Sequence, residues 1–89
     1  MEHSVRVKIQ NRQGLHARPA AEFVKLANRF RARVQVAKDG LDVNGKSIMG
    51  VMMLAAEHGS TIEIRTVGED SEAALAALLE LVNSRFSED

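Results

Sequence analysis

The chain has 89 residues, which predicts a single domain over residues 1–89 with a core just large enough to be stable without cross-links. It contains no cysteine, which excludes disulfides and thiolate metal or redox sites and is compatible with a reducing cytosol. No segment resembles a signal peptide or approaches the roughly 20 apolar residues of a membrane span. We therefore expect a cytoplasmic protein that does not insert into membranes.

The charges are distributed unevenly, although the formal net charge is zero. Residues 1–38 contain nine Lys or Arg and two acidic residues, whereas residues 39–89 contain three basic and ten acidic ones. The basic half could attract an acidic partner or an anionic group, or both sets of charges could simply lie on solvated faces. Nucleic-acid binding is disfavoured, because three Phe and no Tyr or Trp leave little for base stacking.

The first half of the chain predicts a strand, a helix and a hairpin. Apolar residues alternate over Ser4–Gln10, as in a half-buried strand, and a polar loop follows over residues 11–16. The apolar spacing then changes to that of an amphipathic helix over Ala17–Arg29. Arg33–Lys38 alternates again, and Asp39-Gly40 is a typical two-residue hairpin turn. A short return strand around Leu41 and Val43 completes the hairpin.

The second half predicts two helices separated by a strand. Ser47 can cap a short helix over Ser47–Ala55, in which Val51, Leu54 and Ala55 would face the core. Thr61–Thr66 alternates as a strand. Asp70 or Ser71 can cap the last helix, whose apolar stripe consists of Leu75, Leu78, Leu79, Val82 and Phe86. The order β-α-β-β-α-β-α predicts an α+β fold with two layers: a four-stranded, mainly antiparallel sheet covered on one face by three helices and open to solvent on the other.

The segment from Asn11 to Ala20 carries the chemistry. Pro19 is tolerated only in the first turn of a helix, which places His16 at or beside the N-cap. The backbone amides of Ala17 and Arg18 and the positive end of the helix dipole would then favour an anion there. Histidine can carry a phosphoryl group covalently, and the Arg18 guanidinium can bind phosphate oxygens. A surface histidine beside an unrelated arginine remains an alternative on these residues alone.

Two segments resemble a known family. Gly-Leu-His-Ala-Arg-Pro-Ala, residues 14–20, is similar to the active-site signature of the HPr phosphocarriers of the bacterial phosphoenolpyruvate-dependent sugar phosphotransferase system. Residues 46–52, Lys-Ser-Ile-Met-Gly-Val-Met, resemble a second segment of that family at the expected spacing. Gln13 and Met53 depart from the pattern, since smaller or polar residues are common there.

The resemblance implies a phosphoryl relay. His16 would accept phosphate at Nδ1 from phosphorylated enzyme I and pass it to the A domain of a sugar-specific enzyme II, with Arg18 stabilising the phosphate. The chain would act as a phosphohistidine intermediate rather than a free-standing enzyme. It would need no cofactor or metal, and we expect a monomer. A nitrogen-related branch of the same family is an alternative.

The resemblance also implies a regulatory site at Ser47, which a dedicated serine kinase phosphorylates in many members. A phosphate at a helix N-terminus would be accommodated by the dipole. Ile48, Met49 and Met52 would form an exposed patch for several partners, since methionine adapts to different surfaces; the alternative is that all four methionines only fill the core. A protein whose main output is regulatory binding through Ser47 and this patch is a second hypothesis.

A P-loop-like pattern and two further histidines do not indicate functional sites. Residues 40–47 match the P-loop pattern G-x-x-x-x-G-K-[ST], but a P-loop requires a preceding buried strand and a long following helix, and Asp42 would repel phosphate. His3 and His58 have no acid or cysteine at ligand spacing, so we expect both to be exposed and no metal site to form.

Overall fold

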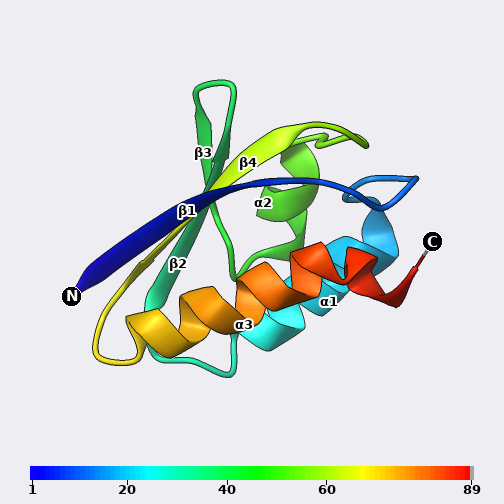
Figure 1. Cartoon of the computed structure of the whole chain (residues 1–89). Helices are drawn as coiled ribbons and strands as arrows, with labels where there is room; N and C mark the ends of the chain where they lie inside the picture. The colour runs from blue at the N-terminus through cyan, green and yellow to red at the C-terminus, as the bar shows by residue number, and fades with distance from the viewer. Residues whose placement is uncertain (89) are drawn as a thin grey trace.

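The computed structural model describes residues 1–88 and follows the predicted order of elements (Figure 1). The strands and helices are, in chain order, β1 (Glu2–Lys8), α1 (Ala17–Ala27), β2 (Arg33–Lys38), β3 (Leu41–Asn44), α2 (Ile48–Met53), β4 (Thr61–Val67) and α3 (Ser71–Asn83). A short 3-10 turn, Arg85–Ser87, follows α3. This turn is the only element that the hydrophobic periodicity did not predict among the described residues.

The four strands form one sheet in the order β1-β4-β2-β3. All three pairings are antiparallel, with Val5 opposite Ile64, Val36 opposite Ile64 and Val36 opposite Val43. Helices α1 and α3 pack against each other, α3 packs on β1 and β4, and α2 packs on α1 (Figure 1). The predicted two-layer α+β architecture is therefore confirmed.

The core lies between the sheet and the helices. Alternate strand residues point into it because successive side chains of a strand face opposite sides of the sheet. The largest fully buried side chains come from the segment after β1, from β4, from both long helices and from the 3-10 turn: Phe23, Phe86, Ile9, Ile62, Ile64 and Leu78. Phe86 belongs to the 3-10 turn, where its φ of 54° turns the chain so that the ring still reaches the core.

Several element boundaries differ from the predicted ones, including the end of β4, which extends by one residue to Val67. Strand β1 runs from Glu2 to Lys8 instead of Ser4 to Gln10, because Glu2 already pairs with Val67. Helix α1 ends at Ala27, two residues early, where the Asn28 side chain donates to the carbonyl of Val24 at 2.9 Å.

Helix α2 is also shorter than predicted. It spans Ile48–Met53, with Ser47 as the N-cap, so the predicted cap is confirmed. Val51 and Leu54 are buried as expected, but the prediction that Ala55 faces the core is wrong. Ala55 has a φ of 49° and is exposed, because the chain leaves the helix there to run toward β4.

The start of α3 is held differently from the prediction. Asp70 occupies the N-cap position, but its carboxylate accepts from the backbone N–H groups of Arg31 and Ala32 at 2.9 and 2.8 Å instead of capping its own helix. Ser71 is buried and its Oγ lies 3.0 Å from Nδ1 of His3. His3 is therefore half-buried and bonded, which contradicts the expectation of an exposed residue, whereas His58 is exposed.

The hairpin between β2 and β3 confirms the two predictions made for this region. Asp39 and Gly40 have φ values of 50° and 85°, as a two-residue turn of the mirror-image type requires. Residues 40–47 form this turn, β3 and a short loop, and the six-residue helix α2 follows. They lack the geometry of a P-loop.

Candidate functional site

His16 lies at the N-cap of α1, as the position of Pro19 in the first turn predicted. Its backbone is extended, with φ −78° and ψ −169°, and its carbonyl accepts the first helical hydrogen bond from Ala20 at 3.0 Å. The imidazole makes no capping hydrogen bond to the helix amides, and 36% of the side chain is exposed. A ring at this position is reachable by a partner and lies at the positive end of the helix dipole.

The loop before His16 is fixed against the chain that precedes β4. Gly14 has a φ of +70°, and a Cβ added there would lie 2.4 Å from the carbonyl oxygen of Ala56. The N–H of Leu15 donates to that same oxygen at 2.8 Å, and the Leu15 side chain is buried. Gly14 therefore permits the close approach to Ala56, and Leu15 anchors the loop to the core.

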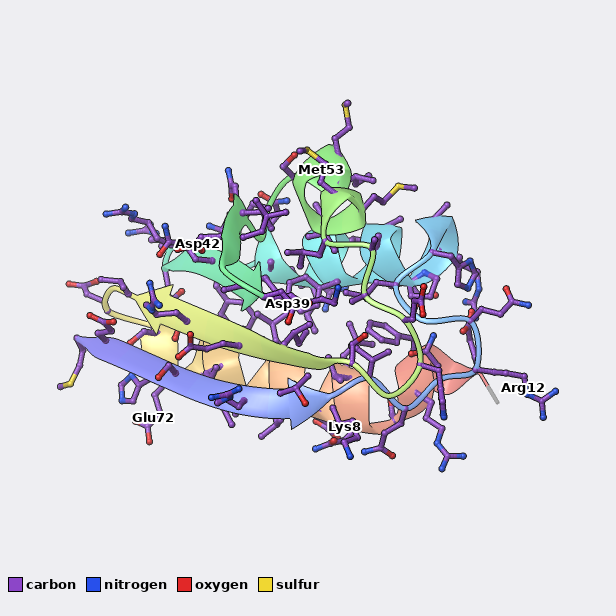
Figure 2. The ribbon with its side chains drawn as sticks, turned by 90° about the horizontal axis from the view of Figure 1, so that it is seen from above. Lys8, Arg12, Asp39, Asp42, Met53 and Glu72 are labelled. Carbon is purple, nitrogen blue, oxygen red and sulfur yellow. The ribbon has the colours of Figure 1, made fainter. Side chains whose placement is uncertain are left out.

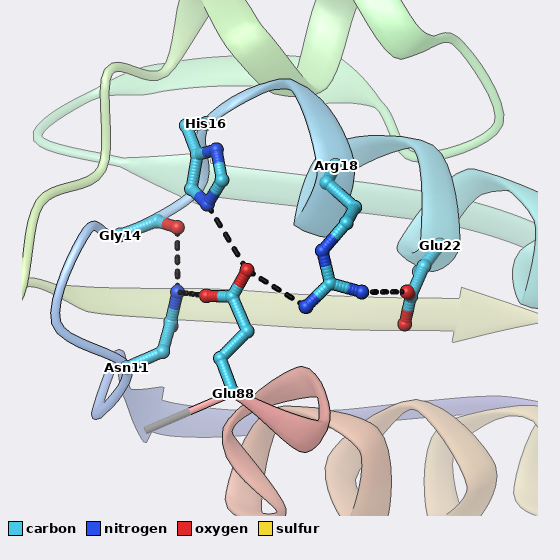
Figure 3. Close-up of polar contacts among 6 residues, drawn as sticks. All are labelled: Asn11, Gly14, His16, Arg18, Glu22 and Glu88. Atoms are coloured by element: carbon cyan, nitrogen blue, oxygen red, sulfur yellow. Dashed lines mark hydrogen bonds and ion pairs between the residues drawn. The ribbon is translucent and has the colours of Figure 1, made fainter.

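Glu88, from the end of the chain, places a carboxylate in this site (Figure 3). Its Oε2 lies 3.1 Å from Nε2 of His16 and accepts from Nη2 of Arg18 at 2.9 Å. Its Oε1 accepts from Nδ2 of Asn11 at 3.0 Å. Side-chain nitrogens of three residues therefore converge on the Glu88 carboxylate.

The Asn11 side chain orients the Glu88 carboxylate. Its side chain is fully buried, and Nδ2 donates both to Glu88 and to the carbonyl oxygen of Gly14, the latter at 2.7 Å. Among the described residues, the Oδ1 atom of Asn11 has no hydrogen-bond partner. The amide thus connects the His16 loop to the end of the chain.

The Arg18 guanidinium forms ion pairs with two carboxylates. Nη1 donates to Glu22 one turn along α1 at 2.6 Å, and Nη2 donates to Glu88. The guanidinium is about half exposed and borders a shallow hollow of about 300 Å³ that is also lined by Arg12, Gln13 and Glu88. Because an arginine fork matches the oxygens of both carboxylate and phosphate, Arg18 can exchange one anion for the other.

The electrostatics of Glu88 agree with its position. Partial burial raises the pKa of its carboxyl group, but hydrogen bonds from Asn11, His16 and Arg18 outweigh this and leave the pKa below its ordinary value of 4.5. Glu88 is therefore ionised at neutral pH and can only accept hydrogen bonds.

His16 is the N-cap of α1, and Ala17 and Arg18 lie in its first turn. Asn11 and Glu88 were missed. Asn11 could have been suspected, since it is an amide before a glycine-containing loop, but Glu88 follows 72 residues after His16 and resembles any other acidic residue near a chain end. Gln13 is exposed and lines the same hollow as Arg18.

The second predicted site lies on α2. Oγ of Ser47 accepts from the N–H of Gly50 at 3.1 Å, which is an ordinary N-cap bond. The apolar side chains beside it are exposed, by 44% for Ile48, 76% for Met49 and 43% for Met52. Met53 is 65% exposed and points away from the ribbon (Figure 2). Core packing of these methionines is therefore excluded.

Other kinds of site find no support in the described part of the chain. Residues 1–88 hold no cluster of three His, Cys, Asp or Glu side chains placed to bind a metal ion. None of the helices within these residues is long and apolar enough to cross a bilayer. Phe23 and Phe86 are fully buried, so they are not available to stack on bases.

Comparison with known proteins places the chain in a family. Residues 3–84 match the family described as "PTS HPr component phosphorylation site". The chain is 45% identical over its whole length to the phosphocarrier protein HPr of Xylella fastidiosa, covering 98% of that relative. It is 48% identical to the same protein of Pseudomonas aeruginosa, covering 96% of each chain.

Solved structures agree. The crystal structure of an HPr from Thermoanaerobacter tengcongensis superposes with a TM-score of 0.95 at 44% identity, covering 98% of both chains. That of an HPr from Bacillus anthracis gives 0.88 at 52% identity, covering 91% of this chain and 96% of the other. A further structure, described as an HPr dimer from Thermoanaerobacter tengcongensis, gives 0.79 at 45% identity, covering 92% of this chain and 94% of the other. The chain therefore belongs to the HPr family, the phosphocarriers of the phosphotransferase system.

Proposed function

We propose that His16 is the residue that carries the phosphoryl group, received from phosphorylated enzyme I and passed on to the A domain of a sugar-specific enzyme II. The observation that carries this proposal is the convergence of donors on the Glu88 carboxylate beside a histidine at a helix N-cap. A site that binds a carboxylate between an imidazole and a guanidinium has the charge and the donors that a phosphoryl group requires.

Arg18 is the clamp in this proposal. A phosphoryl group on His16 carries more negative charge than a carboxylate, so it attracts the exposed Arg18 guanidinium, while Asn11 and His16 keep their bonds to Glu88. The backbone amides of Ala17 and Arg18 lie in the first turn, where helix N–H groups have no intrahelical partner. They are the further donors for phosphate oxygens.

The exposed side chains Ile48, Met49, Met52 and Met53, here called the α2 patch, are the proposed docking surface. Helix α2 packs on α1, whose N-cap is His16, so a partner covering the patch can also reach the histidine. Flexible methionine side chains suit a carrier that must bind one donor and several acceptors. The uncharged patch would supply hydrophobic contact area, and the basic side chains along α1 would attract acidic partners.

Ser47 is the proposed regulatory site. Its Oγ caps α2 directly before Ile48, so phosphorylation would place a charge of about −1.5 to −2 at the edge of the α2 patch. The helix would tolerate this charge at its N-terminus, whereas a partner docked on the patch would meet it. A regulatory output read through Ser47 and the patch is the second candidate function, and the exposure of the patch favours it.

We also propose that the carrier acts as a cytoplasmic monomer, because each transfer requires His16 to enter a different partner's site. The dimer described for a Thermoanaerobacter HPr makes this a point to test. Light scattering coupled to size exclusion distinguishes the two states. A stable dimer at micromolar concentration would contradict the monomer proposal.

Incubation with phosphoenolpyruvate and enzyme I, followed by mass measurement before and after mild acid, tests the relay. We expect one acid-labile phosphate on the wild type and on the control variant His58→Ala, and none on His16→Ala. Labelling of His16→Ala to the wild-type level would overturn the proposal.

The regulatory site is tested with ATP and a serine kinase. An acid-stable phosphate that is lost in Ser47→Ala would establish it. Transfer assays with sugar-branch and nitrogen-branch acceptors would identify the branch.

A further inference from the structure

The contact between Glu88 and His16 determines which ring nitrogen of the histidine carries the proton. A neutral imidazole has one N–H donor and one nitrogen lone pair, whereas an ionised carboxylate can only accept. The 3.1 Å contact between Oε2 of Glu88 and Nε2 of His16 is attractive only when Nε2 carries the proton. The lone pair of the neutral ring is then on Nδ1, which makes no hydrogen bond to the described residues.

Two further residues hold the carboxylate in this position. Arg18 donates to Oε2, the same oxygen that faces His16, at 2.9 Å. Asn11 donates to the other oxygen at 3.0 Å, and its own orientation is fixed by burial and by its 2.7 Å bond to Gly14. With a donor on each oxygen, rotation of the Glu88 carboxylate is restricted, so the tautomer of His16 is specified by geometry.

We propose that Glu88 is a positioning residue that holds His16 as the Nε2–H tautomer and leaves Nδ1 as the atom that accepts the phosphoryl group, an inference that rests on the proposed function. Asn11 orients Glu88 and acts through it. The arrangement corresponds to the carboxylate–imidazole pairs that fix tautomers in other nucleophilic sites.

The chemical step balances without a further reactant. The Nδ1 lone pair forms a bond to phosphorus, the bond between phosphorus and the donor's leaving atom breaks, and that atom keeps the electron pair. The proton stays on Nε2, so the phosphorylated ring carries a positive charge that faces the Glu88 carboxylate. Return transfer to an acceptor reverses this step, and the ring leaves as the neutral Nε2–H form.

The first test is nitrogen-15 NMR of the histidine rings at a pH where they are neutral, because the ring-nitrogen shifts distinguish the two tautomers. His58 is exposed and serves as an internal reference in every spectrum. We expect the Nδ1–H share of His16 to be lower than that of His58 in the wild type and to rise to the His58 value in Glu88→Ala. Glu80→Gln removes an exposed acid of α3 and should change nothing.

The second measurement is the rate of phosphoryl acceptance by the same variants. We expect kcat/KM to fall by on the order of tenfold in Glu88→Ala, comparable to the loss seen when the hydrogen-bond partner of a metal-ligating histidine is removed, and to remain at the wild-type value in Glu80→Gln. If Glu88→Ala fails to fold, Glu88→Leu removes every acceptor atom while keeping more of the side-chain volume, and takes its place in both measurements. An unchanged tautomer ratio, or a shifted ratio with an unchanged rate, would overturn the inference. Failure of the relay itself would appear separately, as labelling of His16→Ala, and would leave the tautomer measurement intact.

Discussion

Replacing Gly14 by alanine tests whether the close approach of the active-site loop to Ala56 matters for stability and transfer. The φ of +70° costs an L-residue about 1–2 kcal/mol. The new Cβ would also lie 2.4 Å from the oxygen of Ala56 and 2.9 Å from Cα of Glu57, both backbone atoms. Relieving such a clash costs about 1–3 kcal/mol more, so we expect Gly14→Ala to lower the free energy of unfolding by about 2–5 kcal/mol.

Gly40 supplies a matched control. It also has a positive φ, +85°, but a Cβ added there would meet nothing within 4 Å. Gly40→Ala should therefore cost only the conformational part, about 1–2 kcal/mol. The difference between the two losses of unfolding free energy therefore measures the cost of the close approach of Gly14 to Ala56.

Urea unfolding followed by circular dichroism gives both values, and phosphoryl acceptance gives the functional consequence. Relief of the clash must shift the loop, and with it the carbonyl of Gly14 that orients Asn11. We therefore expect slower acceptance in Gly14→Ala and wild-type acceptance in Gly40→Ala. Equal losses of stability in the two variants, within about 0.5 kcal/mol, would refute the argument from the close approach.

Three further predictions concern stability. Ser47→Ala removes the N-cap of α2 and should cost about 1 kcal/mol in urea unfolding, whereas Ser47→Asp should cost less because aspartate also caps. Leu78→Ala opens a cavity at a fully buried position and should cost about 2–5 kcal/mol, and a loss below about 1 kcal/mol would contradict the described core. Hydrogen bonds from Arg31 and Ala32 hold the pKa of Asp70 below its ordinary value of 3.8, so this stabilisation is complete above pH 3.8 and is lost as the pH falls further. Asp70→Asn should be less stable than the wild type at pH 7, and the difference should shrink at about pH 2; a difference that persists there would count against this assignment.

The element order was predictable because it depends on local patterns. Alternation in β4 and the apolar stripe of α3 each repeat within a few residues, so the side chains that face the core can be identified from one segment at a time. Errors occurred at element ends, such as Ala55, where the path to the next element decides the conformation.

Polar partners from distant segments were not predictable in the same way. Asp70 has the sequence features of a cap for α3, yet its carboxylate binds the amides of Arg31 and Ala32 in the loop before β2. His3 pairs with Ser71 for a similar reason, since β1 and α3 pack together. An acceptor binds whichever donors the fold brings to it, and the sequence does not indicate which ones these are.

The sequence by itself determined that His16 begins a helix beside Arg18, because Pro19 and the apolar spacing after it act over a single turn. Only the tertiary structure decided what the histidine contacts. Packing of α3 along the sheet brings the chain end back to the start of α1, where Glu88 meets His16 from 72 residues away. The local sequence therefore establishes that His16 lies at a helix start, and the long-range fold determines which carboxylate forms a hydrogen bond with its ring.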